Sequence, residues 1–200
     1  MDQWLLYCGV VFLVVYCPGP MTMFSLSNGI ALPRHVSLAG IAGGTVAYCL
    51  QIAVTYFSLG WIAAQSQGLF HAVKLAGAGY FFWMAYRQIA SGGFDLSARG
   101  VGRPSIPGTF AKGFAIAATN PKSIVFFGAL FPQFIRPGAP YSEQFIVLGL
   151  SYLAIQFSSG LVYVVFGSKL IDFLQRRTTP KTQSRVMASA LALVGLVLLS

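Results

Sequence analysis

Charged residues are scarce in this 200-residue sequence. Asp, Glu, Lys and Arg together make up 8% of the chain, and only four residues are acidic. A soluble globular domain carries about 25% charged residues. Hydrophobic residues make up 56% of the chain, and apolar runs recur at the length of about 18 residues that a membrane-crossing helix needs. The composition therefore predicts an integral membrane protein rather than a soluble domain with a buried core.

The residue pairings that mark common enzyme and metal sites are also missing. The three cysteines form no C-x-x-C pair, so the sequence implies neither a disulfide framework nor a zinc site. No H-E-x-x-H and no G-x-S-x-G motif occurs. The two histidines, His35 and His71, fall on opposite sides of the topology predicted below. We therefore expect no enzymatic activity, no metal and no cofactor.

Six apolar segments alternate with polar or Gly- and Pro-rich connections. These segments cover residues 4–27, 36–59, 69–86, 110–134, 143–167 and 186–200. A helix needs about 20 residues to cross the hydrocarbon core. The last segment has only 15 residues, so it begins earlier, near Thr182, or it forms a short helix, or the chain ends early. The pattern predicts an all-α integral membrane protein with six transmembrane helices.

Basic residues are concentrated in the connections on one side of this predicted bundle. The connections after the first, third and fifth segments hold ten of the 13 Lys and Arg residues. These are Arg34, Arg87, Arg99, Arg103, Lys112, Lys169, Arg176, Arg177, Lys181 and Arg185. The positive-inside rule places these loops in the cytoplasm and both termini in the periplasm. The net charge of +9 is then explained without a nucleic-acid partner.

The longest connection divides the chain almost in half. Residues 88–109 are rich in Gly and Pro, which is typical of a flexible linker. Three segments precede it (repeat 1, about residues 1–90) and three follow it (repeat 2, about residues 110–200), all within a single membrane domain of residues 1–200. Because three is odd, two equivalent halves must insert in opposite directions. This is the inverted-repeat arrangement of many secondary transporters.

The first and fourth segments each contain a helix breaker near the middle. Pro18-Gly19-Pro20 interrupts the first, and Asn120-Pro121-Lys122 interrupts the fourth. Proline removes a backbone hydrogen bond and clashes with the preceding turn, so each motif must break or sharply kink its helix. Paired interruptions at matching positions of two halves indicate a transporter's midplane binding site. A channel is possible in principle, but broken helices in both halves favour alternating access.

Lys122 is a basic residue deep inside a predicted span. One interpretation is that its ammonium meets a substrate carboxylate, with help from the amide end of the half-helix that starts at Pro121. The other is that it reaches the interface or binds the backbone freed by the break. All four acidic residues fall in loops or at segment ends, so no protein carboxylate is available to Lys122 at the midplane. No proton relay is visible for the same reason.

Polar residues also form stripes on the predicted helices. Thr22, Ser25 and Gly29 follow the first break at spacings of three and four, which places them on one face. Their hydroxyls either contact substrate or bind the freed carbonyls. The second span carries Gln51, and the fifth carries Gln156 on a stripe that begins with Tyr152. Each glutamine needs several hydrogen-bond partners, and either a polar substrate or a neighbouring helix could supply them. In the second span, the Gly40-x-x-x-Gly44 spacing indicates close helix packing.

Four blocks in order resemble the LysE/RhtB family of amino-acid exporters. They are Pro18-Gly19-Pro20, Lys74-Leu75-Ala76-Gly77-Ala78-Gly79-Tyr80 followed by Arg87, Asn120-Pro121-Lys122, and Phe126-Phe127 with Phe131-Pro132-Gln133-Phe134. Each block is weak alone, but together they cover nearly the whole chain at family-like distances.

The resemblance implies an exporter of amino acids in the bacterial inner membrane, driven by the proton gradient. The positions of the motifs imply that the transport core contains Pro18, Gly19, Pro20, Asn120, Pro121 and Lys122. To these candidate substrate-binding residues we add Thr22, Gln51 and Gln156.

The sequence departs from the family pattern at two positions. Cys17 stands where a Thr is common in the family. Met21 stands where an Asp or another polar residue often follows the Pro-Gly-Pro motif. The second departure removes an acid that could meet a cationic substrate. It favours a neutral amino acid such as threonine, homoserine or leucine. The alternative is a structural or accessory membrane subunit without transport of its own. The protein could also form a homo-oligomer.

Overall fold

The computed structural model describes residues 2–65, 67–90, 105–136 and 138–199, and throughout these ranges the regular structure is helical. Most of the predicted linker lies outside the described residues. The elements are α1 (Asp2–Tyr16), α2 (Pro20–Ala31), α3 (Arg34–Gln65), α4 (Gln67–Ala90), α5 (Ile106–Ala118), α6 (Pro121–Val125), the π-helix η1 (Phe126–Leu130), the 3-10 helix η2 (Phe131–Phe134), α7 (Tyr141–Arg177) and α8 (Pro180–Leu199).

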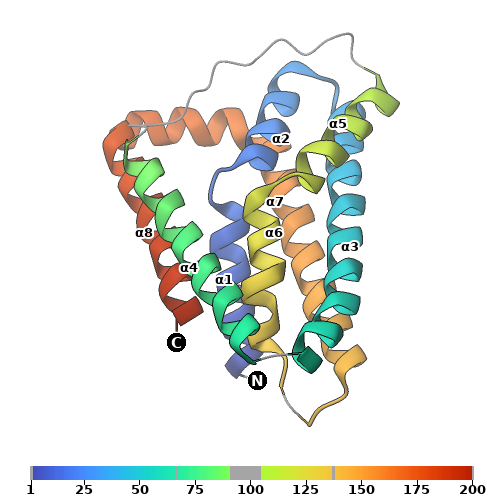
Figure 1. The fold of residues 1–200 in the computed structure, drawn as a ribbon. Helices are drawn as coiled ribbons and strands as arrows, with labels where there is room; N and C mark the ends of the chain where they lie inside the picture. Colours follow the sequence, from blue (N-terminus) through green and yellow to red (C-terminus); the bar gives the residue numbers. More distant parts are fainter. Residues whose placement is uncertain (1, 66, 91–104, 137, 200) are drawn as a thin grey trace.

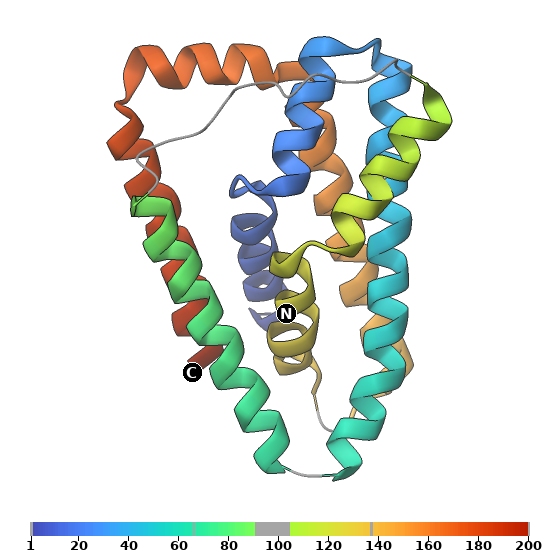
Figure 2. The same ribbon diagram turned by 45° about the horizontal axis from the view of Figure 1, so that its top comes forward.

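The helices run back and forth between two ends of an elongated bundle (Figure 1). α1 begins and α8 ends toward the lower end in this view, where α3 also approaches α4. The connections from α2 to α3 and from α7 to α8 lie at the upper end (Figures 1 and 2). Exposed basic residues, among them Arg34, Lys169, Arg177 and Lys181, lie next to these upper connections.

The predicted breaks in the first and fourth segments are confirmed. α1 and α2 are bent by 58° across their break, and α5 is bent by 46° relative to the helical run from Pro121 to Phe134. Pro20 and Pro121 occupy the first turn of α2 and α6. Proline is tolerated there because the amide that it lacks would have no partner inside the helix. Each break is therefore a helix end followed directly by a new helix start.

Not every predicted span meets the criteria for crossing a membrane. Among the described residues, three helices are long and apolar enough alone, and up to five spans result if each bent pair counts as one. α4 is not among them. The arrangement of six spans in two inverted repeats thus stays a prediction. α8 begins at Pro180, close to the earlier start that was predicted near Thr182. The part of α7 beyond Gly167 turns across the upper end of the bundle (Figure 2).

Close contacts between glycines bring α3 and α5 side by side. A Cβ on Gly113 would collide with the carbonyl oxygen of Gly40, and one on Gly43 would collide with the carbonyl oxygen of Phe110. Such close approach of two backbones requires residues without side chains. Gly44 faces the side chain of Met21. The predicted packing role of the Gly40-x-x-x-Gly44 spacing is confirmed.

An aromatic core fixes the second half of the fourth span against α1 and α7. Tyr7 packs edge-on against Phe131 with ring centroids 6.0 Å apart. Phe127 lies 4.6 Å from Tyr152 by the same measure. The Tyr7 hydroxyl donates to the carbonyl of Leu148 at 2.9 Å. This core joins η1 and η2 to α1 and α7.

Candidate functional site

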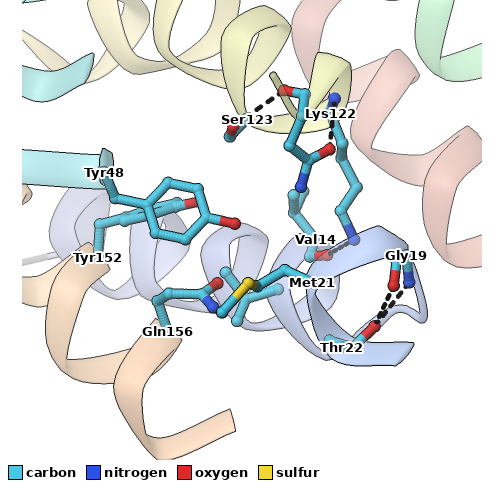
Figure 3. A pocket seen from close by; sticks show the side chains of 11 residues that line it. Val14, Gly19, Met21, Thr22, Tyr48, Lys122, Ser123, Tyr152 and Gln156 are labelled. Carbon is cyan, nitrogen blue, oxygen red and sulfur yellow. Dashed lines mark hydrogen bonds between the residues drawn. The ribbon is translucent and has the colours of Figure 1, made fainter. Parts of the chain in front are cut away.

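A small cavity lies where the two helix breaks meet (Figure 3). Side chains from α1, α2, α3, α6 and α7, together with the breaks themselves, enclose it. Its lining consists of Val14, Val15, Gly19, Met21, Thr22, Tyr48, Asn120, Lys122, Ser123, Tyr152 and Gln156. The volume of about 10 Å³ is close to the smallest space that holds one water molecule. The site is therefore polar, shared by both halves of the chain, and occluded in this conformation.

Thr22 organises the start of α2. Its Oγ1 accepts a hydrogen bond from the amide of Gly19 at 2.6 Å and donates one to the carbonyl of the same residue at 2.9 Å. The hydroxyl thus satisfies backbone groups that the break releases, which is one of the two roles predicted for it. Thr22 is 4% exposed and also lines the cavity.

Lys122 crosses from the second break to the first. Its ammonium donates to the carbonyl oxygen of Val14 at 2.8 Å and to that of Cys17 at 2.7 Å. These carbonyls lie at the C-terminal end of α1, where the helix dipole is negative and the acceptors have no partner within the helix. The interpretation that Lys122 binds the freed backbone is therefore confirmed for this conformation. Lys122 also lines the cavity, and an ammonium has three donors, of which these bonds use two.

The environment of Lys122 explains why residue 19 is glycine. A Cβ at Gly19 would lie 3.0 Å from the Lys122 Nζ and 3.4 Å from its Cε. The backbone of Gly19 is extended, a conformation that any residue adopts. Space beside the ammonium, and not backbone freedom, therefore favours glycine here.

Asn120 holds the start of the half-helix that carries Lys122. Its Oδ1 accepts from the amide of Lys122 at 3.1 Å, as an N-cap side chain does. Its carbonyl oxygen accepts from the Ser123 hydroxyl at 3.0 Å. Asn120 is 3% exposed, so this network fixes the direction in which Lys122 leaves α6.

The two predicted glutamines differ in what they contact. The Nε2 of Gln51 donates to the carbonyl oxygens of Ala117 and Ala118, each at 3.1 Å, at the end of α5. Gln51 is not part of the cavity lining. Gln156 lines the cavity, is 5% exposed, and makes no side-chain hydrogen bond to the other described residues. The neighbouring-helix alternative therefore describes Gln51, whereas Gln156 stays available to a ligand.

The structure brings five of the nine predicted site residues together. Gly19, Thr22, Asn120, Lys122 and Gln156 all line the cavity. Pro18, Pro20, Pro121 and Gln51 do not. The prolines act through the backbone, because they end or begin the half-helices whose termini surround the cavity.

Two aromatic lining residues were not predicted as site residues. Tyr48 and Tyr152 both line the cavity, and their rings pack edge-on with centroids 5.6 Å apart (Figure 3). The sequence spacing could have identified them. Tyr48 precedes Gln51 by three residues and Tyr152 precedes Gln156 by four, and both spacings place the tyrosine on the same helix face as the glutamine. Met21, singled out for replacing an acid, lines the cavity as well.

A larger groove of about 440 Å³ lies elsewhere, between α3 and α7. Its walls are mainly apolar and include the strongly exposed Phe57, Ile146 and Leu150. An apolar surface of this kind suits lipid, and it offers no charged group for a polar substrate. In the described part of the chain, no cluster of His, Cys, Asp and Glu could hold a metal ion. We take the cavity at the breaks as the candidate site, because residues of both breaks and the buried Lys122 line it.

Comparison with known proteins also indicates a membrane translocator. Residues 11–200 match the family model described as LysE type translocator. A homoserine/homoserine lactone efflux protein of Salmonella typhimurium is 28% identical, with 100% of this chain and 97% of the relative covered. An uncharacterized membrane protein of Vibrio cholerae is also 28% identical, with 98% and 95% covered. No solved structure matches the chain.

Proposed function

This chain belongs to the LysE type translocator family, and on that premise we propose that it exports an amino acid across the bacterial inner membrane. The substrate is a neutral amino acid of the threonine, homoserine or leucine type, and the proton gradient drives its export. The names of the Salmonella relatives support homoserine as the first compound to test.

One observation carries this proposal: the buried ammonium of Lys122 lies in an occluded polar cavity between two broken helices. A cation within a membrane span is costly, and such residues typically mark a substrate or ion pathway. Among the described residues no carboxylate forms an ion pair with Lys122. Its remaining N–H is a donor for a substrate carboxylate, which would supply the missing negative charge.

The rest of the lining suits the other end of an amino acid. The rings of Tyr48 and Tyr152 line the cavity, and aromatic rings attract cations such as the ammonium group of an amino acid. The lining contains no carboxylate. A second positive charge on the substrate would therefore be buried without a partner, which favours a neutral side chain.

The occluded cavity fits alternating access. A space for about one water molecule cannot hold an amino acid, so binding requires the helices around the breaks to move. In the proposed topology, six spans form two inverted repeats, with the basic connections in the cytoplasm and both termini in the periplasm. Exposed Arg34 and Lys169 beside the upper connections support this orientation.

Transport by purified protein in liposomes tests the proposal. Vesicles loaded with a panel of labelled amino acids receive an imposed pH gradient, and release is compared between wild type, Lys122→Met and Lys112→Met. Lys112 is the matched control because it is an exposed lysine in α5, six residues before the end of that helix. We expect gradient-driven release of homoserine or another neutral amino acid by wild type and by Lys112→Met, and none by Lys122→Met. No release of any amino acid by wild type would contradict the proposal and favour an accessory role.

A further inference from the structure

A second groove, of about 360 Å³, lies at the lower end of the bundle, where α1 and α7 begin (Figure 1). Its volume falls within the range of about 300–1,000 Å³ that is usual for small-molecule sites. Its lining includes the charged Arg136 and Glu143, the amides Gln3 and Gln144, and the indole of Trp4. The groove therefore offers two side chains of opposite charge, and it is much larger than the cavity at the breaks.

Arg136 is held in place by neighbouring amides. Its Nε donates to the Oε1 of Gln3 at 2.6 Å, and its backbone amide donates to the Oε1 of Gln144 at 2.8 Å. The Nε2 of Gln144 in turn donates to the carbonyl oxygens of Arg136 and Ala139, each at 3.2 Å. Within the described ranges, the two terminal nitrogens of the guanidinium make no hydrogen bond. The protein thus orients the guanidinium and leaves its terminal N–H groups as donors for a ligand.

Glu143 supplies the opposite charge to the same groove. It is exposed and belongs to the first turn of α7, where the helix dipole favours an acidic side chain. To the rest of the described chain, its carboxylate makes neither an ion pair nor a hydrogen bond. Arg136 and Glu143 therefore line one groove without binding each other. Each is able to form a charge-assisted hydrogen bond with an opposite charge on a ligand.

A series of aromatic rings connects this groove with the cavity at the breaks. Tyr152 lines the cavity, and its ring centroid lies 5.2 Å from that of Phe126. The ring centroid of Phe126 lies 6.3 Å from that of Tyr7, which lies 5.1 Å from that of Phe134. Phe134 lines the groove, and all four rings are buried. The aromatic core thus lies between the cavity and the groove.

We propose that the groove is a second substrate site, which binds the zwitterion of an α-amino acid on the side where the exporter releases it. The Arg136 guanidinium binds the carboxylate, and the Glu143 carboxylate binds the ammonium group. The inference rests on the proposed function, which places the lower end of the bundle in the periplasm. An amino acid that leaves the cavity toward this end passes the aromatic core and reaches the groove. There both of its charges find a partner, whereas the cavity lining offers the single charge of Lys122.

The fluorescence of Trp4 reports binding directly, because Trp4 lines the groove and is 43% exposed. The chain has three tryptophans, so Trp61→Phe and Trp83→Phe leave Trp4 as the single one. This protein, purified in detergent without lipid, is titrated with homoserine, with homoserine carboxamide and with γ-hydroxybutyrate. The carboxamide lacks the negative charge, and γ-hydroxybutyrate lacks the ammonium group. We expect homoserine to bind at least tenfold more tightly than either, because each analogue loses one charge-assisted hydrogen bond.

Variants of the two charged residues locate the binding. Arg136→Gln and Glu143→Gln should each weaken homoserine binding at least tenfold. The exchanged pair, Arg136→Glu with Glu143→Arg, should recover part of the binding, because both charges are present again. Lys74→Gln is the matched control, since it removes a positive charge from the first half of α4 and Lys74 does not line the groove. Unchanged binding by Glu143→Gln, or an equal loss in Lys74→Gln, would overturn the proposal.

A lipid headgroup with the same two charges is the competing occupant. Phosphatidylethanolamine carries a phosphate and an ammonium group, whereas phosphatidylglycerol has no ammonium group. The titration is repeated in nanodiscs of each lipid, and we expect the same response to homoserine in both. A Trp4 emission that depends on phosphatidylethanolamine and on Glu143, without a response to homoserine, would overturn the proposal in favour of a lipid site.

Homoserine efflux from liposomes separates this inference from the proposed function. Lys122→Met should retain the Trp4 response to homoserine although it abolishes efflux, because Lys122 does not line the groove. A Trp4 response without efflux by the wild type would contradict the proposed function and support the zwitterion site. Efflux by the wild type without a Trp4 response would contradict the release site alone.

Discussion

The Lys122 ammonium lies 2.8 Å from the carbonyl oxygen of Val14, so a side chain from the second broken span satisfies the backbone of the first. Val14 lies two residues before the end of α1, and Lys122 is the second residue of α6. This bond makes the two breaks one structural unit. Any movement that opens the cavity must either preserve the bond or replace the ammonium with another donor.

Replacement of Lys122 by arginine should abolish transport although the positive charge is kept. The cavity has room for about one water molecule, and Gly19 lies against the ammonium. A planar guanidinium is larger and binds acceptors in a fixed fork, so it cannot reproduce the contacts with the carbonyls of Val14 and Cys17. Amino-acid release from liposomes measures the effect. Transport by Lys122→Arg at the wild-type rate would contradict the account of this site.

The Gly19→Ala variant should reach the membrane but transport at least tenfold more slowly. The new methyl group would lie 3.0 Å from the Lys122 Nζ, a tight contact that shifts the ammonium by a few tenths of an ångström and strains its hydrogen bonds to the carbonyls. A tenfold loss corresponds to about 1.4 kcal/mol. Gly9→Ala in α1 is the control, because nothing lies within 4 Å of its Cβ position. Equal rates for the two variants would show that space beside Lys122 does not matter.

Loss of the N-cap at the second break should destabilise the protein. Asn120→Ala removes the acceptor for the Lys122 amide, and such a change costs about 1 kcal/mol. Asn120→Ser retains an N-cap oxygen and should recover part of that stability. Thermal unfolding in detergent, followed by circular dichroism, measures both. If alanine and serine gave the same midpoint as wild type, Asn120 would not serve as the cap.

The Gly113→Ala variant should weaken the contact between α3 and α5. Its methyl group would collide with the Gly40 carbonyl, and overpacking of this kind costs about 1–3 kcal/mol. Gly79→Ala is the matched control, since its Cβ position is open and alanine is the better helix former. Denaturation midpoints of the two variants should therefore move in opposite directions. A Gly113→Ala protein as stable as wild type would contradict the close packing of these helices.

Much of the fold could be predicted from patterns that act locally. The two breaks follow from proline chemistry at Pro18-Gly19-Pro20 and at Pro121, and the helix starts at Pro20 and Pro121 follow from the same cause. The extension of α7 to Arg177 was missed, because a polar and charged stretch at the end of an apolar run gives no span signal although it still forms helix.

The site was predicted less completely because its contacts join distant segments. The motifs identified Gly19, Asn120 and Lys122, since breakers and a buried charge are conspicuous in an apolar chain. Nothing local indicates that Lys122 would bind carbonyls more than 100 residues away. The same holds for Gln51, which binds the carbonyls of Ala117 and Ala118, and for Gln156, which lines the cavity, because these neighbours lie far away in the sequence.

The most direct test of the central claim compares homoserine with its carboxamide, in which the carboxylate is a neutral amide, as substrates of wild type and Lys122→Met in liposomes. We predict that wild type transports homoserine at least tenfold faster than the carboxamide, because a charge-assisted hydrogen bond is worth about 1.5–3 kcal/mol, and that Lys122→Met loses this preference. An equal preference for homoserine in both proteins would show that Lys122 does not recognise the carboxylate.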